Sequence, residues 1–93
     1  MCVRFVWDAR KAAANLRKHG VTFEEATTTF MDPLALVVDD ASHPERSRII
    51  GESALRHILV TVFVEAVEDD IRIVSARHAT RGERRRYEEG QEA

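Results

Sequence analysis

Arginine is the most abundant residue type in this sequence that could bind an anion, since there are twelve arginines and only two lysines among 93 residues. A guanidinium group is planar and binds phosphate or carboxylate through two parallel hydrogen bonds. Residues 1–20 carry a net charge of +4 and residues 71–87 a net charge of +5, whereas residues 21–45 hold six acidic residues and no basic one. This distribution predicts a basic face that binds a polyanion despite the overall charge of −2, although any single charge could equally belong to a solvated helix face.

The sequence shows no spacing typical of a metal site or of a common catalytic motif. Its four histidines and single cysteine form no C-x-x-C or H-x-x-x-H pair. It also contains no G-x-S-x-G, no glycine-rich phosphate loop and no dinucleotide fingerprint. We therefore expect neither a metal nor a cofactor, and chemistry carried by arginine, lysine, histidine and aromatic side chains.

The N-terminal half predicts one short strand and two helices that would position these side chains. Residues 3–7 are rich in strand-forming types, and Asp8 is suited to cap a helix that ends at His19–Gly20. The Thr22–Glu25 segment has the pattern of a capping box, in which each side chain bonds the other residue's free amide. It predicts a second helix over residues 23–30.

The first helix has two distinct faces. Apolar side chains at helical spacing form a stripe that we expect to pack on a sheet: Ala9, Ala12, Ala13 and Leu16. The opposite face carries Lys11, Asn15 and Lys18, and we expect the lysines to point outward.

The C-terminal half predicts four strands and a last helix. The strands are expected at residues 34–38, 48–52, 56–64 and 71–78. The third is hydrophobic enough to be a central strand that is buried on both faces. Regular alternation in the fourth places one set of side chains on a common face: Ile71, Ile73, Ser75 and Arg77. A second capping box, Thr80–Glu83, opens a helix that extends to about Tyr87.

The order β-α-α-β-β-β-β-α predicts an α+β fold in which helices pack on a small, mainly antiparallel sheet. A chain of this length is expected to form a single domain, residues 1–93. The longest apolar run, Ile58–Val64, is too short to span a membrane, and the N-terminal residues lack the pattern of a signal peptide. Cys2 is the single cysteine, so we expect no internal disulfide and a reducing, cytoplasmic location without membrane contact.

Motifs distributed along nearly the whole chain resemble those of the BrnT toxin family. They are Phe5–Asp8, Lys11, Asn15, Lys18–Val21, Phe23–Ala26, Phe30, Asp32–Pro33, Ile50–Gly51, Ile71–Arg77 and Glu83–Tyr87. The K-H-G-V and I-R-I-x-S-A-R segments together carry most of this resemblance. The sequence departs from the family pattern in the loop His43–Arg48, at Arg56–His57 where a Gly-Arg pair is usual, and at Ala66 where an arginine is common.

The resemblance implies a RelE-like fold and a type II toxin, an endoribonuclease that arrests growth in the cytoplasm of a prokaryote. It also implies a BrnA-like antitoxin as partner, RNA as substrate, and contact with operator DNA only through the toxin–antitoxin complex. An alternative of another class is a non-catalytic regulatory subunit that binds nucleic acid or a partner protein on the same fold, because a fold does not by itself determine a function.

A metal-independent ribonuclease would use the neighbouring 2′-hydroxyl to attack the phosphate. Arg77 is the first candidate to stabilise the negative charge of the transition state, with Arg81 at the positive end of the last helix as the second. Candidates for proton transfer are Lys18, His19, His57 and Tyr87. Candidates for binding RNA are Trp7, Lys11, Arg48 and Arg56.

Each of the main candidates also has a structural interpretation. Arg77 could form an ion pair with an acidic loop, and His19 could bond the free carbonyl groups at the end of the first helix. Tyr87 could be a packing anchor, and Trp7 a core residue beside Phe5. These alternatives remain open at the level of sequence.

Overall fold

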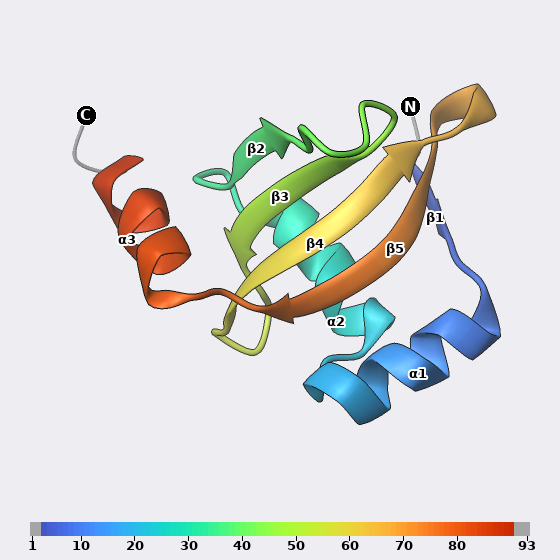
Figure 1. Ribbon diagram of the computed structural model, residues 1–93, viewed down its shortest axis with the longest axis horizontal. Coiled ribbons are helices and arrows are strands. Elements are labelled where there is room, and N and C mark those ends of the chain that lie inside the picture. The colour runs from blue at the N-terminus through green and yellow to red at the C-terminus, as the bar shows by residue number, and fades with distance from the viewer. Residues whose placement is uncertain (1–2, 91–93) are drawn as a thin grey trace.

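The computed structural model describes residues 3–90, in which three α-helices pack on a five-stranded sheet (Figure 1). The elements are β1 (Arg4–Val6), α1 (Ala9–His19), α2 (Phe23–Thr28), η1 (Thr29–Met31), β2 (Leu36–Asp39), β3 (Ser47–Glu52), β4 (Ile58–Glu65), η2 (Val67–Asp69), β5 (Asp70–His78) and α3 (Arg81–Gly90). The predicted order of helices and strands and the α+β class are confirmed. Cys2 lies outside the described residues. No described helix is long and apolar enough to cross a membrane.

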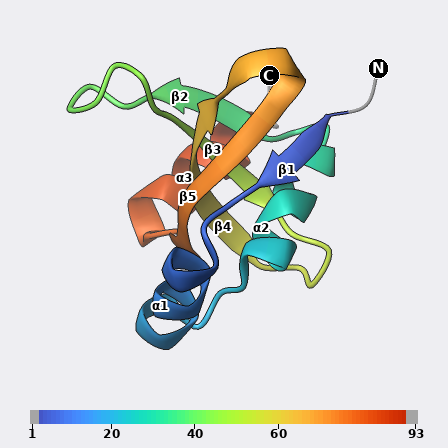
Figure 2. The ribbon, with the colours of Figure 1, turned by 90° about the vertical axis from the view of Figure 1, so that its right-hand side faces the viewer.

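The sheet has the strand order β1-β5-β4-β3-β2, so the predicted central strand, β4, lies in the middle. β2, β3, β4 and β5 pair antiparallel, whereas β1 pairs parallel with β5 and lies along its outer edge (Figure 2). β4 begins at Ile58 rather than at Arg56, because Arg56 has a φ of 69° and belongs to the turn that joins β3 to β4.

The helices divide the sheet into a covered side and a largely open side. α2 lies behind the sheet in the view of Figure 1, α1 lies below it beside β5, and α3 lies in front of it at one end only. The larger apolar cluster lies between the sheet and α2 and contains Val21, Phe23, Ala26, Ile49, Leu59, Phe63, Ile73 and Ala76. A smaller cluster holds α3 on the other side and contains Ile50, Val60 and Tyr87.

The ends of α1 follow from local sequence. The Asp8 carboxylate accepts hydrogen bonds from the amides of Arg10 and Lys11 at 2.8 and 3.2 Å, and so satisfies two of the free donors of the first turn. Gly20 closes the helix with a φ of 71°, where a side chain would be strained, and its amide donates to the Leu16 carbonyl.

The predicted faces of α1 are correct in part: Ala12 packs on the larger cluster and the two lysines are exposed, but the amide of Asn15, and not Leu16, meets the sheet. Asn15 is only 6% exposed, whereas Leu16 is 48% exposed. The Asn15 amide donates to the carbonyls of Val21 and Ala76, at 3.0 and 2.8 Å, and its oxygen accepts from the Ala76 amide at 3.1 Å. These three bonds satisfy the buried side chain and fix α1 against β5.

A bulge at Val74 changes the predicted faces of β5, because the pairing with β4 shifts by one residue between Ile73 and Ser75. A bulge inserts an unpaired residue and so reverses the alternation of side chains beyond it. Ile71 and Ile73 pack on the cluster behind the sheet, whereas Ser75 and Arg77 point to the open side. The common face predicted for these four residues is therefore wrong, although Ser75 and Arg77 do share one.

Candidate functional site

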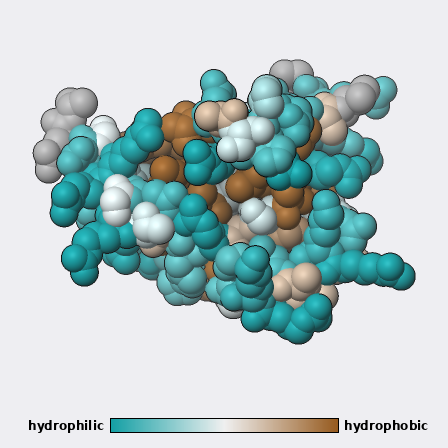
Figure 3. All heavy atoms as spheres, in the orientation of Figure 1, coloured by the Kyte–Doolittle hydropathy of each residue, from teal (hydrophilic) through white to brown (hydrophobic). Residues whose placement is uncertain are grey.

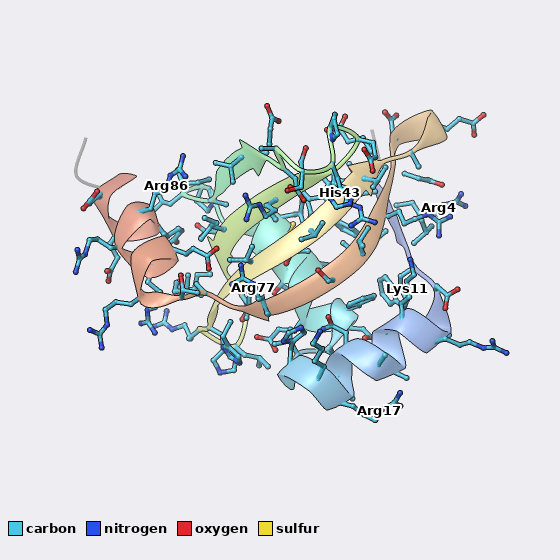
Figure 4. The ribbon with its side chains drawn as sticks, viewed as in Figure 1. Arg4, Lys11, Arg17, His43, Arg77 and Arg86 are labelled. Atoms are coloured by element: carbon cyan, nitrogen blue, oxygen red, sulfur yellow. The ribbon has the colours of Figure 1, made fainter. Side chains whose placement is uncertain are left out.

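Basic side chains from several elements surround the uncovered side of the sheet. We call this side, between α1 and α3 and formed by β3, β4 and β5, the open face. Figure 4 shows Arg77 near its middle, with Lys11 on α1 at one side and Arg86 on α3 at the other. Arg48 on β3 points to the same side, because its partner in the register is Val62 and the next pair on that side joins Ile50 to Val60. Residues far apart in the sequence thus form one basic surface.

The floor of the open face is apolar. Val62, Val64 and Val74 are half-buried there. Figure 3 shows hydrophobic surface along the strands, with hydrophilic side chains around it. An apolar floor within a basic rim suits a nucleotide chain, because phosphates need cations while bases and sugars present apolar surface.

The Arg77 guanidinium forms a bidentate ion pair with Glu83 of α3. Nη1 donates to Oε1 at 2.7 Å and Nη2 donates to Oε2 at 2.9 Å, while Nη1 also donates to the carbonyl of His78 at 3.2 Å. The hydrogen bonds from Arg77 lower the pKa of Glu83 to about 2 against the opposing effect of burial, and those same bonds raise the pKa of Arg77. The ion-pair interpretation of Arg77 is therefore correct, although its partner lies in a helix and not in a loop.

A pocket of about 280 Å³ lies between the start of α3 and the open face. We call it the arginine pocket, and it is lined by Val38, Arg48, Ile50, Val60, Thr80, Gly82, Glu83 and Arg86. The Arg48 Nε is buried and has no hydrogen-bond partner among the described residues. The pocket thus combines two arginines with the positive end of a ten-residue helix, which suits an anion.

A second pocket of about 210 Å³ lies between α1 and β5. We call it the lysine pocket, and it is lined by Lys11, Ala14, Asn15, Lys18, His19, Val74 and Ser75. It brings together three of the predicted site residues, Lys11, Lys18 and His19. Ser75, two residues before Arg77 on β5, lines this pocket, and Glu83, the ion-pair partner of Arg77, lines the arginine pocket. Arg77 therefore lies between the two pockets.

His57 belongs to a different cluster on the α2 side of the sheet. Its Nδ1 lies 2.8 Å from Oε2 of Glu25, and the Ser53 hydroxyl donates to the same oxygen at 2.6 Å. The imidazole also packs edge-to-face on His78, with ring centroids 5.1 Å apart. Arg77 points to the opposite side, so the structure does not bring His57 to the open face with it. The glutamate of the capping box was the one sequence feature that pointed to this cluster.

Tyr87 and Trp7 both occupy packing positions, so the structural interpretation of each residue fits its surroundings. Tyr87 is 5% exposed, and its hydroxyl donates to Oδ2 of Asp32 at 2.5 Å. Burial opposes ionisation of Asp32, but hydrogen bonds from the Glu52 amide, Tyr87 and the Leu34 amide together lower its pKa. Trp7 packs on the larger apolar cluster, with its ring edge-to-face to Phe23 at 5.9 Å.

The remaining predicted residues lie at the margins. Arg81 is exposed at the first position of α3, next to the arginine pocket but not in its lining. Arg56 lies in the β3–β4 turn and lines a separate pocket of about 320 Å³ with Arg84 and Glu88. Sequence analysis missed Arg86 and Glu83 as site residues, although the capping box marked Glu83. Within residues 3–90, no three side chains of His, Cys, Asp or Glu gather as metal ligands.

Comparison with known proteins identifies the family. The family model for the ribonuclease toxin BrnT of type II toxin–antitoxin systems matches residues 7–83. The crystal structure of the Brucella abortus ribonuclease toxin BrnT, at 1.1 Å resolution, superposes with a TM-score of 0.71 over 86% of this chain and 100% of that chain, at 23% sequence identity. No curated protein matches the sequence. The chain therefore belongs to the BrnT family of ribonuclease toxins of type II toxin–antitoxin systems.

Proposed function

We propose that this protein is an endoribonuclease toxin that cleaves RNA on the open face without a metal ion. The observation that carries the proposal is the position of Arg77 between two basic pockets on an uncovered, apolar sheet surface. Four elements supply the cations, α1, β3, β5 and α3, so the surface can follow a chain of phosphates. Membership in a family of ribonuclease toxins supports RNA as the substrate.

In this proposal the 2′-hydroxyl of RNA loses its proton and attacks the adjacent phosphate, the bond from phosphorus to the 5′-oxygen breaks, and the departing 5′-oxygen takes up a proton. The transition state gains negative charge, and a preorganised donor there contributes about 10²–10³ in rate. Arg77 is the proposed donor, with Lys11, Arg48 and Arg86 binding neighbouring phosphates.

We assign proton transfer to side chains of the lysine pocket. His19 is the one histidine, among the described residues, that lines either pocket next to Arg77. It lies beside Lys18 in the last turn of α1. We therefore propose His19, assisted by Lys18, in place of His57.

The partner in this proposal is a BrnA-like antitoxin that covers the open face. Without the antitoxin the toxin arrests growth in the cytoplasm of a prokaryote, and operator DNA is contacted through the antitoxin in the complex. Residues 1–93 act as one toxin domain.

Cleavage of a defined RNA by the purified chain tests the proposal. Activity is expected to persist in excess chelator and to be lost in Arg77→Ala. Arg4→Ala is the matched control, because Arg4 likewise pairs with a carboxylate, that of Asp70, but at the other end of β5 from Arg77. Loss of activity in chelator that zinc or magnesium restores would refute the metal-independent mechanism.

A non-catalytic subunit that binds RNA or a partner protein is the second candidate. It is favoured by one observation: the outer edge of the Arg77 guanidinium, formed by Nη1 and Nη2, is already bound to Glu83. Under this alternative the wild-type chain binds RNA without cleaving it, and its expression does not arrest growth.

A further inference from the structure

The hydrogen bonds of Arg77 leave one edge of its guanidinium open. A guanidinium has five N–H donors. Two donors point to the Glu83 carboxylate, and a third, from Nη1, points to the His78 carbonyl. The two that remain are Nε–H and the second hydrogen of Nη2, which lie side by side on one edge and match two oxygens of a phosphate.

That edge is accessible from solvent. Nε of Arg77 has no hydrogen-bond partner among the described residues. The buried side-chain atoms without a partner in this part of the chain are Arg48 Nε and Thr61 Oγ1, so Nε of Arg77 is not buried. The Arg77 side chain is 35% exposed and points to the open face. A phosphate on this face can therefore reach both unused donors.

Arg4 shows the opposite arrangement. Its Nε donates to Oδ1 of Asp70 at 3.1 Å and its Nη2 donates to Oδ2 at 2.8 Å, so the carboxylate occupies the edge that is open in Arg77. Both arginines are paired, but only Arg77 keeps the edge suited to a phosphate.

The carboxylate that binds Arg77 is itself fixed. Oε1 of Glu83 accepts a hydrogen bond from the Thr80 amide at 2.9 Å, and the Glu83 amide donates to the Thr80 hydroxyl at 3.2 Å. The start of α3 therefore holds Glu83, and Glu83 holds the guanidinium in one orientation.

We propose that Glu83 is a positioning residue, which holds the outer edge of Arg77 and thereby presents the Nε/Nη2 edge to a phosphate of the RNA. This inference rests on the proposed function. Glu83 also places a negative charge beside the RNA, which opposes binding. Its removal should therefore weaken catalysis while leaving RNA binding unchanged or tighter, and a purely structural residue would not produce that split.

Steady-state cleavage by the full chain tests this split. Glu83→Ala is expected to lower kcat by roughly 10–100-fold, the range found for groups that orient a ligand through hydrogen bonds, with KM unchanged or lower. Thr22→Ala is the matched control, because it removes the equivalent helix-cap bond at α2, on the covered side of the sheet, and its kcat should stay near that of the wild type. In an Arg77→Lys background, Glu83→Ala should have no further effect, since lysine has no such edge. Equal losses of kcat in Thr22→Ala and Glu83→Ala, or additive effects in the double variant, would overturn the proposal.

A binding measurement separates this inference from the proposed function. The NMR signal of Arg77 Nε–H should shift when a 2′-O-methyl RNA, which cannot react, is added to the wild-type chain, and this shift should be lost in Glu83→Ala. If the wild type fails to cleave RNA but the signal shifts, the proposed function fails and the role of Glu83 stands. If RNA binds without shifting the signal, the role of Glu83 is refuted, whether or not the chain cleaves RNA.

Discussion

Two helices of this protein begin with the same pattern, Thr-x-x-Glu, but their glutamates bind different groups. At α2 the Glu25 amide donates to the Thr22 hydroxyl at 3.0 Å, while the carboxylate of Glu25 turns away to bind Ser53 and His57. The predicted reciprocal bond is thus replaced there. At α3 both bonds of the capping box form, and the carboxylate also binds Arg77.

The difference shows how one local motif can serve two purposes. The Glu25 side chain is 8% exposed and ties the β3–β4 turn to α2 on the covered side of the sheet. The Glu83 side chain is 22% exposed and holds a permanent cation on the open face. The first glutamate stabilises a turn, whereas the second orients a group that can meet a ligand. Four predictions test this contrast.

Replacing the partner of each capping-box glutamate should give the largest difference. Arg77→Ala should lower the rate of RNA cleavage by about 10²–10³-fold, and Arg77→Lys nearly as much, because an ammonium group cannot reproduce the planar fork. His57→Gln should have a far smaller effect, because His57 lies on the covered side. The measurement is the initial rate on a defined RNA, with circular dichroism to check folding. A folded Arg77→Lys variant that cleaves as fast as the parent would show that Arg77 contributes only charge.

Association with the antitoxin should distinguish the two sides of the molecule. We expect an antitoxin segment with acidic or amphipathic helical residues that face Lys11, Lys18, Arg77 and Arg81. The association rate should then fall about 10-fold or more between about 50 and about 500 mM salt, because salt screens exposed charges. Lys18→Glu should slow association, whereas Glu24→Lys on α2 should not. A rate that does not depend on salt would indicate docking on apolar surface.

Acid should weaken the bonds of the Glu83 carboxylate at the start of α3 in a defined pH range. Glu83 has a pKa of about 2 in the folded chain, against 4.5 for an ordinary glutamate, so its contribution is complete above about pH 4.5 and is lost as the pH falls toward 2. Glu83→Gln should remove this part of the pH dependence, on the order of 1–2 kcal/mol after allowance for partial exposure. Urea unfolding from pH 2 to 7 measures it, and Thr80→Ala should keep the wild-type slope. Equal slopes in Glu83→Gln and the wild type would contradict the assignment.

The threonines should give the smallest effects, and equal ones. Thr22→Ala and Thr80→Ala each remove one bond to a free amide of the first helical turn and should each lower the free energy of unfolding by about 1 kcal/mol. Urea unfolding at neutral pH checks this. A much larger loss in Thr80→Ala would show that the cap and the Arg77 ion pair act cooperatively.

Local signals in the sequence were sufficient to predict the order of the elements. Asp8 and Gly20 cap α1 as expected, and the Thr80–Glu83 box is complete. These features depend on residues within a few positions of one another. They could therefore be recognised without knowledge of the tertiary structure.

The features that the sequence did not predict depend on distant partners. Burial of Asn15 requires Ala76, 61 residues away, and the bulge at Val74 arises from pairing with β4. The bulge determines which side chains share the open face with Arg77. The candidate site was accordingly predicted in part: Lys18 and His19 do line a pocket beside Arg77's strand, but His57 lies on the other side.

The pairing of the first strand with the last has a consequence for synthesis of the toxin. Arg4 pairs with Asp70, 66 residues later, so at about 5–20 residues per second β1 waits roughly 3–13 s on the ribosome for its partner. Asn15 waits almost as long for Ala76, 61 residues later, and Arg77 and Glu83 are added after that. A chain that stops before residue 70 therefore lacks β5, the strand that joins β1 to the rest of the sheet and carries Arg77. If the open face cleaves RNA as proposed, prematurely terminated products are inactive, and the chain gains its activity only when its translation is almost complete.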